Sequence, residues 1–213
     1  MLSTPKHHEI DHHTIKLIVG VIAVSLASVT GLLTENNITS VSASYHAGGW
    51  ARDYFVGSLF AIFAFLLAYN GYSRIEMILS KVAAIAALGV AMFPCQCESH
   101  QEIVPAVHGV CAAVMFLILA IFCYLFRQRA QAKPNDEAKR RSFIYSCCGI
   151  AIVISIVVLG IDSLSGGAIS SGFERLTYFG EMVGLVSFGI AWLAASRVFP
   201  MITHADERFH PFG

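Results

Sequence analysis

Seven ionisable side chains lie inside or beside strongly apolar segments, and their types are suited to binding chemistry. They are Arg52, Asp53, His108, Asp162, Glu174, Arg175 and Glu181. Ionisable groups within a membrane segment are costly, so they normally face the interior of a helix bundle or a wet cavity and find partners there. We therefore expect an outward-facing polar pocket that binds a lipid headgroup, a small ligand or a partner helix. Aromatic residues near the same interface, such as Tyr45 and Trp50, suit contact at headgroup level.

The same residues also have structural interpretations. A histidine embedded in a helix often holds two helices together, and this interpretation applies to His108. Glu181 is flanked by glycines and could pair with Arg52 or Arg175 where helices approach closely. Asp53 could cap the helix that begins near it. Packing and ligand binding therefore both stay open for these groups.

A membrane-embedded lipid hydrolase or transferase is the alternative function. In that case His108 or a metal-bound water acts as the base, Asp53 or Glu181 orients it, and an arginine holds an anionic group. Zinc is the metal considered, and it needs three or four ligands that converge in a tetrahedron. The candidate ligands are His46, Asp53, His100 and His108.

Neither an HExxH motif nor paired CxxC motifs accompany these candidate ligands, and no other cofactor is evident. Cys95 and Cys97, separated by one residue, could form a disulfide or contact a metal. A transporter is a weaker alternative, because the two groups of three apolar segments show no convincing internal repeat.

Six apolar segments must position these residues. They run from about Thr14 to Thr34, Tyr54 to Tyr72, Met77 to Phe93, from Pro105 to near Phe126, Ser142 to Asp162, and about Arg175 to Ala195. Each is close to the roughly 20 residues that a helix needs to cross a bilayer. The sequence predicts an all-α, polytopic integral membrane helix bundle with six transmembrane helices, over residues 14–197, between tails at 1–13 and 198–213.

Composition agrees with a membrane protein. The chain is 56% hydrophobic and 13% charged, and 14 basic residues balance 14 acidic ones. Its mean hydropathy is +0.66. Too few charged residues are present to cover a soluble globule of this length.

Basic residues predict the orientation. They concentrate between the fourth and fifth segments, at Arg127, Arg129, Lys133, Lys139, Arg140 and Arg141. Because basic loops stay in the cytoplasm, this loop and both termini should be cytoplasmic. Lys16 and Lys81 lie close enough to segment ends to snorkel. The basic loop is too short to indicate nucleic-acid binding, and it could touch anionic lipid headgroups. Expected partners are membrane lipids, a second copy of the chain or another membrane protein.

Short motifs along the chain resemble a bacterial six-helix membrane family. They are ITSVSAS at 38–44, RDYFVG at 52–57, ALG at 87–89 leading to FP at 93–94, His108, and GFER at 172–175. The family is domain of unknown function 998, which is itself distantly similar to the Frag1/DRAM/Sfk1 membrane proteins. The resemblance implies cytoplasmic termini and a location in the bacterial inner (cytoplasmic) membrane, and it brings no catalytic residue.

A second pattern is similar to the alkaline ceramidase and adiponectin-receptor superfamily of intramembrane zinc hydrolases. It consists of Ser42, His46 and Asp53. The chain departs from that superfamily because it has six apolar segments rather than seven and lacks HxxxH near the end of the last one. His204 and His210 lie in the tail on the opposite side, so this resemblance is set aside.

Overall fold

The fold, seen in a computed structural model, is all-α over the residues that the structure describes, which are 11–35, 38–97, 100 and 104–210. The helices are α1 (His12–Leu33), α2 (Ser44–Ala47), α3 (Gly49–Ala68), α4 (Arg74–Met92), α5 (Val107–Gln131), α6 (Asp136–Leu164) and α7 (Leu176–Ala195). Two 3-10 turns follow, η1 (Pro200–Ile202) and η2 (Ala205–Glu207). All helices except α2 are long and apolar enough to span a membrane. The predicted all-α fold with six membrane spans is confirmed.

The helix ends differ from the predicted ones by a few residues in most spans, and the largest differences are at the second span and around the basic loop. The second span begins at Gly49 and not at Tyr54, because Gly48 (φ 73°) and Gly49 (φ 50°) adopt left-handed conformations that turn the chain directly from α2 into α3. The predicted basic loop is largely helical, since α5 continues to Gln131 and α6 already begins at Asp136. All of its cations except Lys133 are therefore held on helix ends.

Side-chain caps fix three of the helix starts. The carboxylate of Asp11 accepts from His13 N (3.2 Å), the hydroxyl of Ser73 accepts from Glu76 N (3.2 Å), and Asn135 accepts from Ala138 N (2.8 Å). Each bond satisfies an amide that has no partner within its helix. All three caps lie at the end of the bundle where the chain termini are found.

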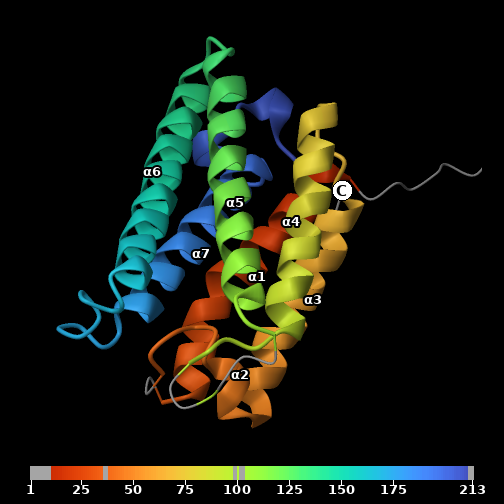
Figure 1. Ribbon diagram of the computed structural model, residues 1–213. Coiled ribbons are helices and arrows are strands. Elements are labelled where there is room, and N and C mark those ends of the chain that lie inside the picture. Colours follow the sequence, from red (N-terminus) through yellow and green to blue (C-terminus); the bar gives the residue numbers. More distant parts are fainter. Residues whose placement is uncertain (1–10, 36–37, 98–99, 101–103, 211–213) are drawn as a thin grey trace, which may run out of the picture.

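The six long helices form a bundle (Figure 1), in which each packs mainly against two neighbours in a closed ring and α5 also contacts α7. The order around the ring is α1, α3, α4, α5, α6, α7 and back to α1. We call the end with the start of α1, the end of α7 and the 132–135 connection the basic end, and the opposite end, with α2, the loop end. In Figure 1 the basic end is at the top.

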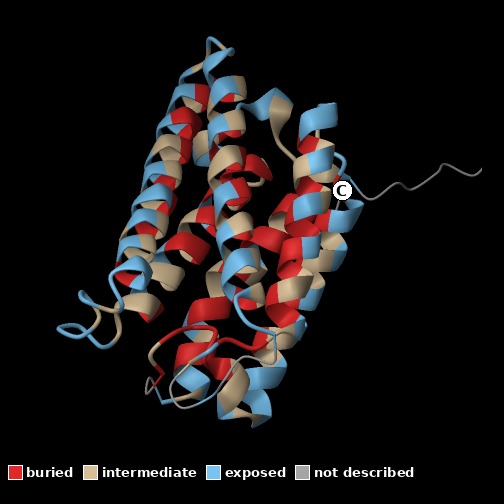
Figure 2. Cartoon of the chain, in the orientation of Figure 1, coloured by how far each residue is buried: buried red, intermediate tan, exposed pale blue. Residues whose placement is uncertain are grey.

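The core lies inside this ring, where buried residues line the facing sides of the helices (Figure 2). α1 and α7 approach most closely at Gly20 and Gly189, because a Cβ on Gly189 would lie 2.8 Å from Gly20 O. Toward the basic end, Trp192 packs against Phe122, Phe126 and Tyr69. This aromatic group forms the floor beneath the basic end.

The C-terminal segment 198–210 folds back across the basic end. Arg140 donates to Met201 O (3.1 Å), Arg141 donates to Ile202 O (2.6 Å), and Phe209 N donates to Arg197 O (3.1 Å). The predicted C-terminal tail is thus attached to the helices by hydrogen bonds, and Ile202 at its start also packs against the core.

Candidate functional site

Two of the predicted site residues, His108 and Glu181, meet at a third residue near the loop end. Ser42 Oγ lies 3.1 Å from His108 Nε2 and 3.1 Å from Glu181 Oε1. Glu181 Oε2 also accepts from Val41 N (2.6 Å), and His108 Nδ1 lies 2.7 Å from Phe93 O. Since a carbonyl oxygen only accepts, Nδ1 carries a proton. The cluster therefore ties the 38–43 segment to α5 and α7.

This cluster does not have the order of a serine nucleophilic triad. In a nucleophilic triad the histidine stands between the hydroxyl and the acid, whereas here Ser42 stands between His108 and Glu181. The adjoining cavity, which Ser42 and Glu181 help to line, holds only about 20 Å³, enough for one water. Glu181 pairs with Ser42 and Val41, and the predicted pairing with Arg52 or Arg175 is wrong.

The other predicted residues lie apart from this cluster. Asp53 is exposed beside Arg52 (3.8 Å), and it does not cap α3, whose N-cap is Gly48. Asp162 is buried and accepts from Ile169 N and Ser170 N (2.9 Å each), so it closes its own loop. Asp53 and Asp162 therefore do not share a pocket with His108 and Glu181.

The two residues at the start of α7 also act locally. Glu174 is exposed. The guanidinium of Arg175 lies over the rings of Tyr178 (4.4 Å) and Phe179 (5.2 Å). Such cation–π contacts hold the arginine against its own helix.

The four candidate metal ligands do not converge. His46 and His100 stack with ring centroids 4.1 Å apart, and His46 Nε2 lies 2.9 Å from Cys95 O. Cys95 and Cys97 form a disulfide, which removes both thiolates as ligands. In the described part of the chain, no group of three or more His, Cys, Asp or Glu side chains is arranged to hold a metal ion.

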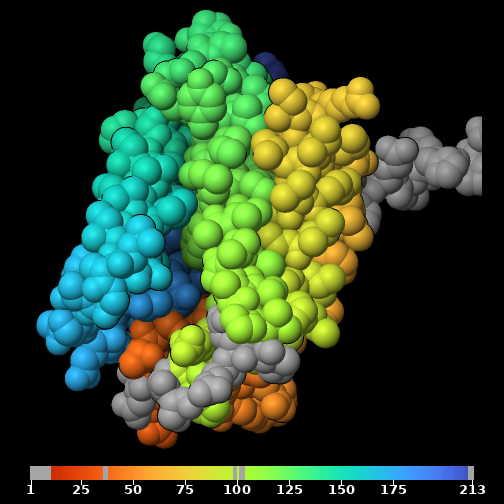
Figure 3. Space-filling model, in the orientation of Figure 1, coloured from red at the N-terminus to blue at the C-terminus, as the bar shows by residue number. Residues whose placement is uncertain are grey.

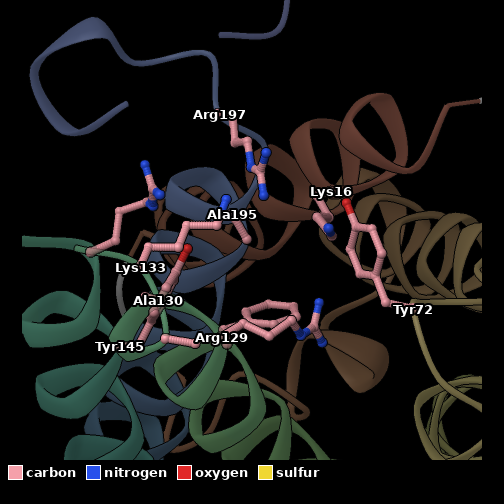
Figure 4. A pocket seen from close by; sticks show the side chains of 11 residues that line it. Lys16, Tyr72, Arg129, Ala130, Lys133, Tyr145, Ala195 and Arg197 are labelled. Carbon is pink, nitrogen blue, oxygen red and sulfur yellow. The ribbon is translucent and has the colours of Figure 1, made fainter. Parts of the chain in front are cut away.

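The largest collection of charge lies instead at the basic end, around a cavity of about 430 Å³ (Figure 4). We call it the basic cavity. Five cationic side chains line it, from α1, α5, α6 and the residues just before α6 and after α7: Lys16, Arg129, Lys133, Arg141 and Arg197. Tyr72, Phe126 and Tyr145 supply its aromatic walls. A volume of this size falls in the range of small-molecule sites.

Helical spacing explains how these side chains come together. Phe126 and Arg129 are three residues apart on α5 and share one side at its end, and Lys133 follows in the 132–135 connection. Arg141 and Tyr145 are four residues apart on α6 and share a face in the same way. The ring of helices then brings Lys16 from α1 and Arg197 from the end of α7 to the same space.

Lys16 differs from the other cations of the cavity because it forms no salt bridge with a described residue, and the carboxylates of Glu76 and Asp11 act on it only from beyond contact distance. It is 2% exposed, and no described residue makes a hydrogen bond or salt bridge with its ammonium. Its contacts are the rings of Tyr72 (4.8 Å), Tyr69 (5.6 Å) and Phe126 (5.6 Å). Figure 4 shows the Lys16 side chain directed toward Tyr72 at the edge of the cavity. A buried ammonium without an anion is strongly unfavourable.

Two carboxylates balance part of the remaining charge. Glu76, 3% exposed at the start of α4, forms a salt bridge with Arg129. Glu207 from η2 contacts Lys133, Arg141 (3.0 Å) and Arg197 (3.9 Å). Burial by itself would raise the pKa of Glu207, but the hydrogen bond from Lys133 and the nearby positive charges outweigh it and lower that pKa. Five cations thus face two carboxylates, so the cavity keeps an excess of positive charge.

From the sequence, these cations are assigned to topology and snorkelling, and those of the basic loop also to contact with anionic headgroups. Neither Glu76 nor Glu207 is singled out. One signal was present, because Lys16 and Glu76 are ionisable residues at the ends of apolar segments and such residues often mark sites. The matching helical spacings on either side of the 132–135 connection were a second signal. Neither signal shows that Lys16 and Glu76 lie near the residues on either side of the 132–135 connection.

The comparisons with known proteins give a family and no function. The family described as "Protein of unknown function (DUF998)" matches residues 15–191. No curated protein and no solved structure matches the chain. The matched range contains all six membrane spans except the first three residues of α1 and the last four of α7.

Proposed function

The chain belongs to DUF998, a family of unknown function, and for this multi-pass membrane protein we propose that the basic cavity binds a phosphate-bearing anion. The observation that carries the proposal is the unpartnered ammonium of Lys16. A dianionic or monoanionic phosphate in the cavity would supply the missing counter-charge, and the arginines there offer donors that match phosphate oxygens.

The neighbouring residues support the same ligand chemistry. Arg141 is 3% exposed, and its guanidinium donates hydrogen bonds to Ile202 O and to Glu207. Because these contacts already fix the side chain, it does not have to be ordered when an anion binds. Arg129 lies over the rings of Tyr72 (4.8 Å) and Phe126 (5.3 Å), which restrict it similarly. A site whose cations are already fixed loses little side-chain entropy on binding.

The phosphate has two sources, a membrane lipid headgroup or a free phosphorylated small molecule. The positive-inside rule puts the basic end in the cytoplasm, where anionic lipids and phosphorylated metabolites are both within reach. This proposal moves the predicted headgroup site from the outward-facing pocket to the opposite end of the bundle. At the loop end the polar groups of Ser42, His108 and Glu181 are already satisfied by one another.

Calorimetry with a soluble probe tests the proposal. Protein in nanodiscs of phosphatidylcholine is titrated with glycerol 3-phosphate, using the wild type, Lys16→Met and the control Lys139→Met. Lys139 is an exposed lysine of the same end that pairs with Asp136. We expect the wild type and the control to bind equally, and Lys16→Met to bind at least about tenfold more weakly, because a charged hydrogen bond contributes about 1.5–3 kcal/mol. Equal binding by all three proteins, or no binding by the wild type, would refute the proposal.

A further inference from the structure

A second hollow lies on the outer surface between α5 and α6, the helices that stand side by side in Figure 3. We call it the side groove. Its volume is about 290 Å³, and most of its lining is apolar, including Ala120, Ile150, Val153 and Ile154. Val153 and Ile154 are about half exposed. In a membrane-spanning bundle this surface faces hydrocarbon.

The side groove adjoins the basic cavity. Tyr145 lines both spaces, so the two meet at its side chain. In Figure 4 the Tyr145 hydroxyl points into the basic cavity, and no described residue hydrogen-bonds to it. At the same end of the side groove, Arg127 contributes a guanidinium whose buried Nε has no hydrogen-bond partner in the described ranges. The groove therefore begins at polar residues, Tyr145 and Arg127, and continues as an apolar channel.

The depth of the side groove matches one leaflet. Along α6 it extends from Tyr145 to Ile154, which is about 14 Å at 1.5 Å per residue. Half of the bilayer hydrocarbon is about 15 Å. Within the predicted apolar segment Ser142–Asp162, the groove starts about one turn from the boundary at the basic end and passes the middle by less than one turn. It therefore lies mostly in the leaflet on that side.

We propose that the ligand of this protein is an anionic membrane lipid from the leaflet at the basic end, with its phosphate in the basic cavity and one acyl chain in the side groove. This inference rests on the proposed function and selects the lipid over the free phosphorylated molecule. A cationic cavity and an apolar groove that share one wall fit a molecule with a phosphate and a hydrocarbon chain. A soluble phosphate compound would use only the basic cavity.

A matched pair of variants tests the acyl-chain site. Val153→Phe fills the side groove, whereas Val157→Phe places the same ring one turn deeper on α6, outside the groove. Val153 and Val157 are similarly exposed, at 48% and 51%. Each protein is reconstituted in phosphatidylcholine nanodiscs doped with increasing phosphatidylglycerol, and native mass spectrometry counts the phosphatidylglycerol molecules retained. A thermal melt of each variant establishes that the fold is intact.

We expect Val153→Phe to weaken phosphatidylglycerol retention at least about tenfold, equivalent to about 1.4 kcal/mol, while Val157→Phe equals the wild type. Glycerol 3-phosphate should bind the wild type and both variants alike, because it does not use the side groove. If Val153→Phe and Val157→Phe retain phosphatidylglycerol equally, the acyl-chain site is refuted, and glycerol 3-phosphate binding by the wild type then leaves the phosphate site standing. If the wild type binds neither probe, both proposals fall together.

Discussion

Replacing Lys16 by methionine should stabilise the empty protein and abolish its response to a phosphate ligand. The two effects have opposite signs because Lys16 is 2% exposed and forms no direct ion pair with a described residue, since Glu76 and Asp11 act on it only from beyond contact distance. A residue that only packs would lose stability on substitution, and a residue that only binds at a surface would leave stability unchanged. The combination therefore identifies a cation held ready for an absent anion.

The magnitude follows from the contacts of Lys16. Burying an unpaired charge costs several kcal/mol even after relaxation. Three aromatic rings, at 4.8, 5.6 and 5.6 Å from the ammonium, offset about 0.5–2 kcal/mol each. Methionine keeps most of the aliphatic packing without the charge, so we expect a gain of about 1–3 kcal/mol in the free energy of unfolding. For a chain of this size that raises Tm by roughly 2–4 °C per kcal/mol.

Thermal melts in phosphate-free buffer, with and without glycerol 3-phosphate, provide the assay. At a ligand concentration about one hundred times Kd, the wild type should gain about 2.7 kcal/mol, and Lys16→Met should gain nothing. Lys139→Met controls for the loss of one positive charge at the same end and should behave as the wild type does. A lower Tm for empty Lys16→Met together with an intact ligand response would refute the reasoning, because Lys16 would then be a packing residue.

Three further predictions concern the contacts around the two ends of the bundle. His108→Ala should lower the free energy of unfolding by about 2–4 kcal/mol in a denaturant titration, because the buried hydrogen bonds to Ser42 and Phe93 are lost. Unchanged stability would contradict the role of His108 in joining these segments. Acidification should detach the C-terminal segment: the pKa of Glu207 is lowered below its ordinary value of 4.5, since the Lys133 hydrogen bond and the basic neighbours outweigh burial. Its stabilisation is therefore complete above that ordinary value and is lost as pH falls through the folded-state pKa. Melts from about pH 6 to about pH 3 should show this loss in the wild type and not in Glu207→Gln, and identical acid sensitivity would count against it. Glu181→Gln should lower the free energy of unfolding by about 1–3 kcal/mol, because the side chain loses one oxygen that accepts from backbone and hydroxyl donors. Asp53, which pairs with Arg52 at the surface, is the control, and Asp53→Asn should change stability by less than about 0.5 kcal/mol. Thermal melts compare the two variants, and equal effects would argue against the buried cluster.

The membrane fold could be predicted from the sequence because the bilayer imposes a local constraint. A backbone in hydrocarbon must satisfy its own hydrogen bonds, so apolar runs of about 20 residues become helices whatever surrounds them. The ends of those helices were harder to predict, since they depend on turn conformations such as Gly48 and Gly49 and on caps such as Asn135. Hydropathy also treats the cations after Phe126 as loop residues, although most of them extend α5 and α6.

The site was only partly predictable for the same physical reason. That His108 and Glu181 would find buried partners follows from their cost in an apolar segment. The identity of the partner, Ser42, depends on a loop packing between α5 and α7, which no sequence spacing encodes. Asp53 and Asp162 have equally suitable chemistry, but the structure directs one to solvent and the other to its own loop.

By itself, the sequence determined that this chain crosses a membrane six times, because each span is decided by the hydrophobicity of one short segment. Only the tertiary structure decided that Lys16, Arg141 and Arg197 face one cavity. These residues are separated by 125 and 56 positions along the chain, and their convergence depends on the order of helices around the ring and on how each is rotated. The order and the rotation of the helices are set by packing between segments that are far apart in the sequence, such as Gly20 against Gly189. They are therefore determined only when the whole bundle is assembled.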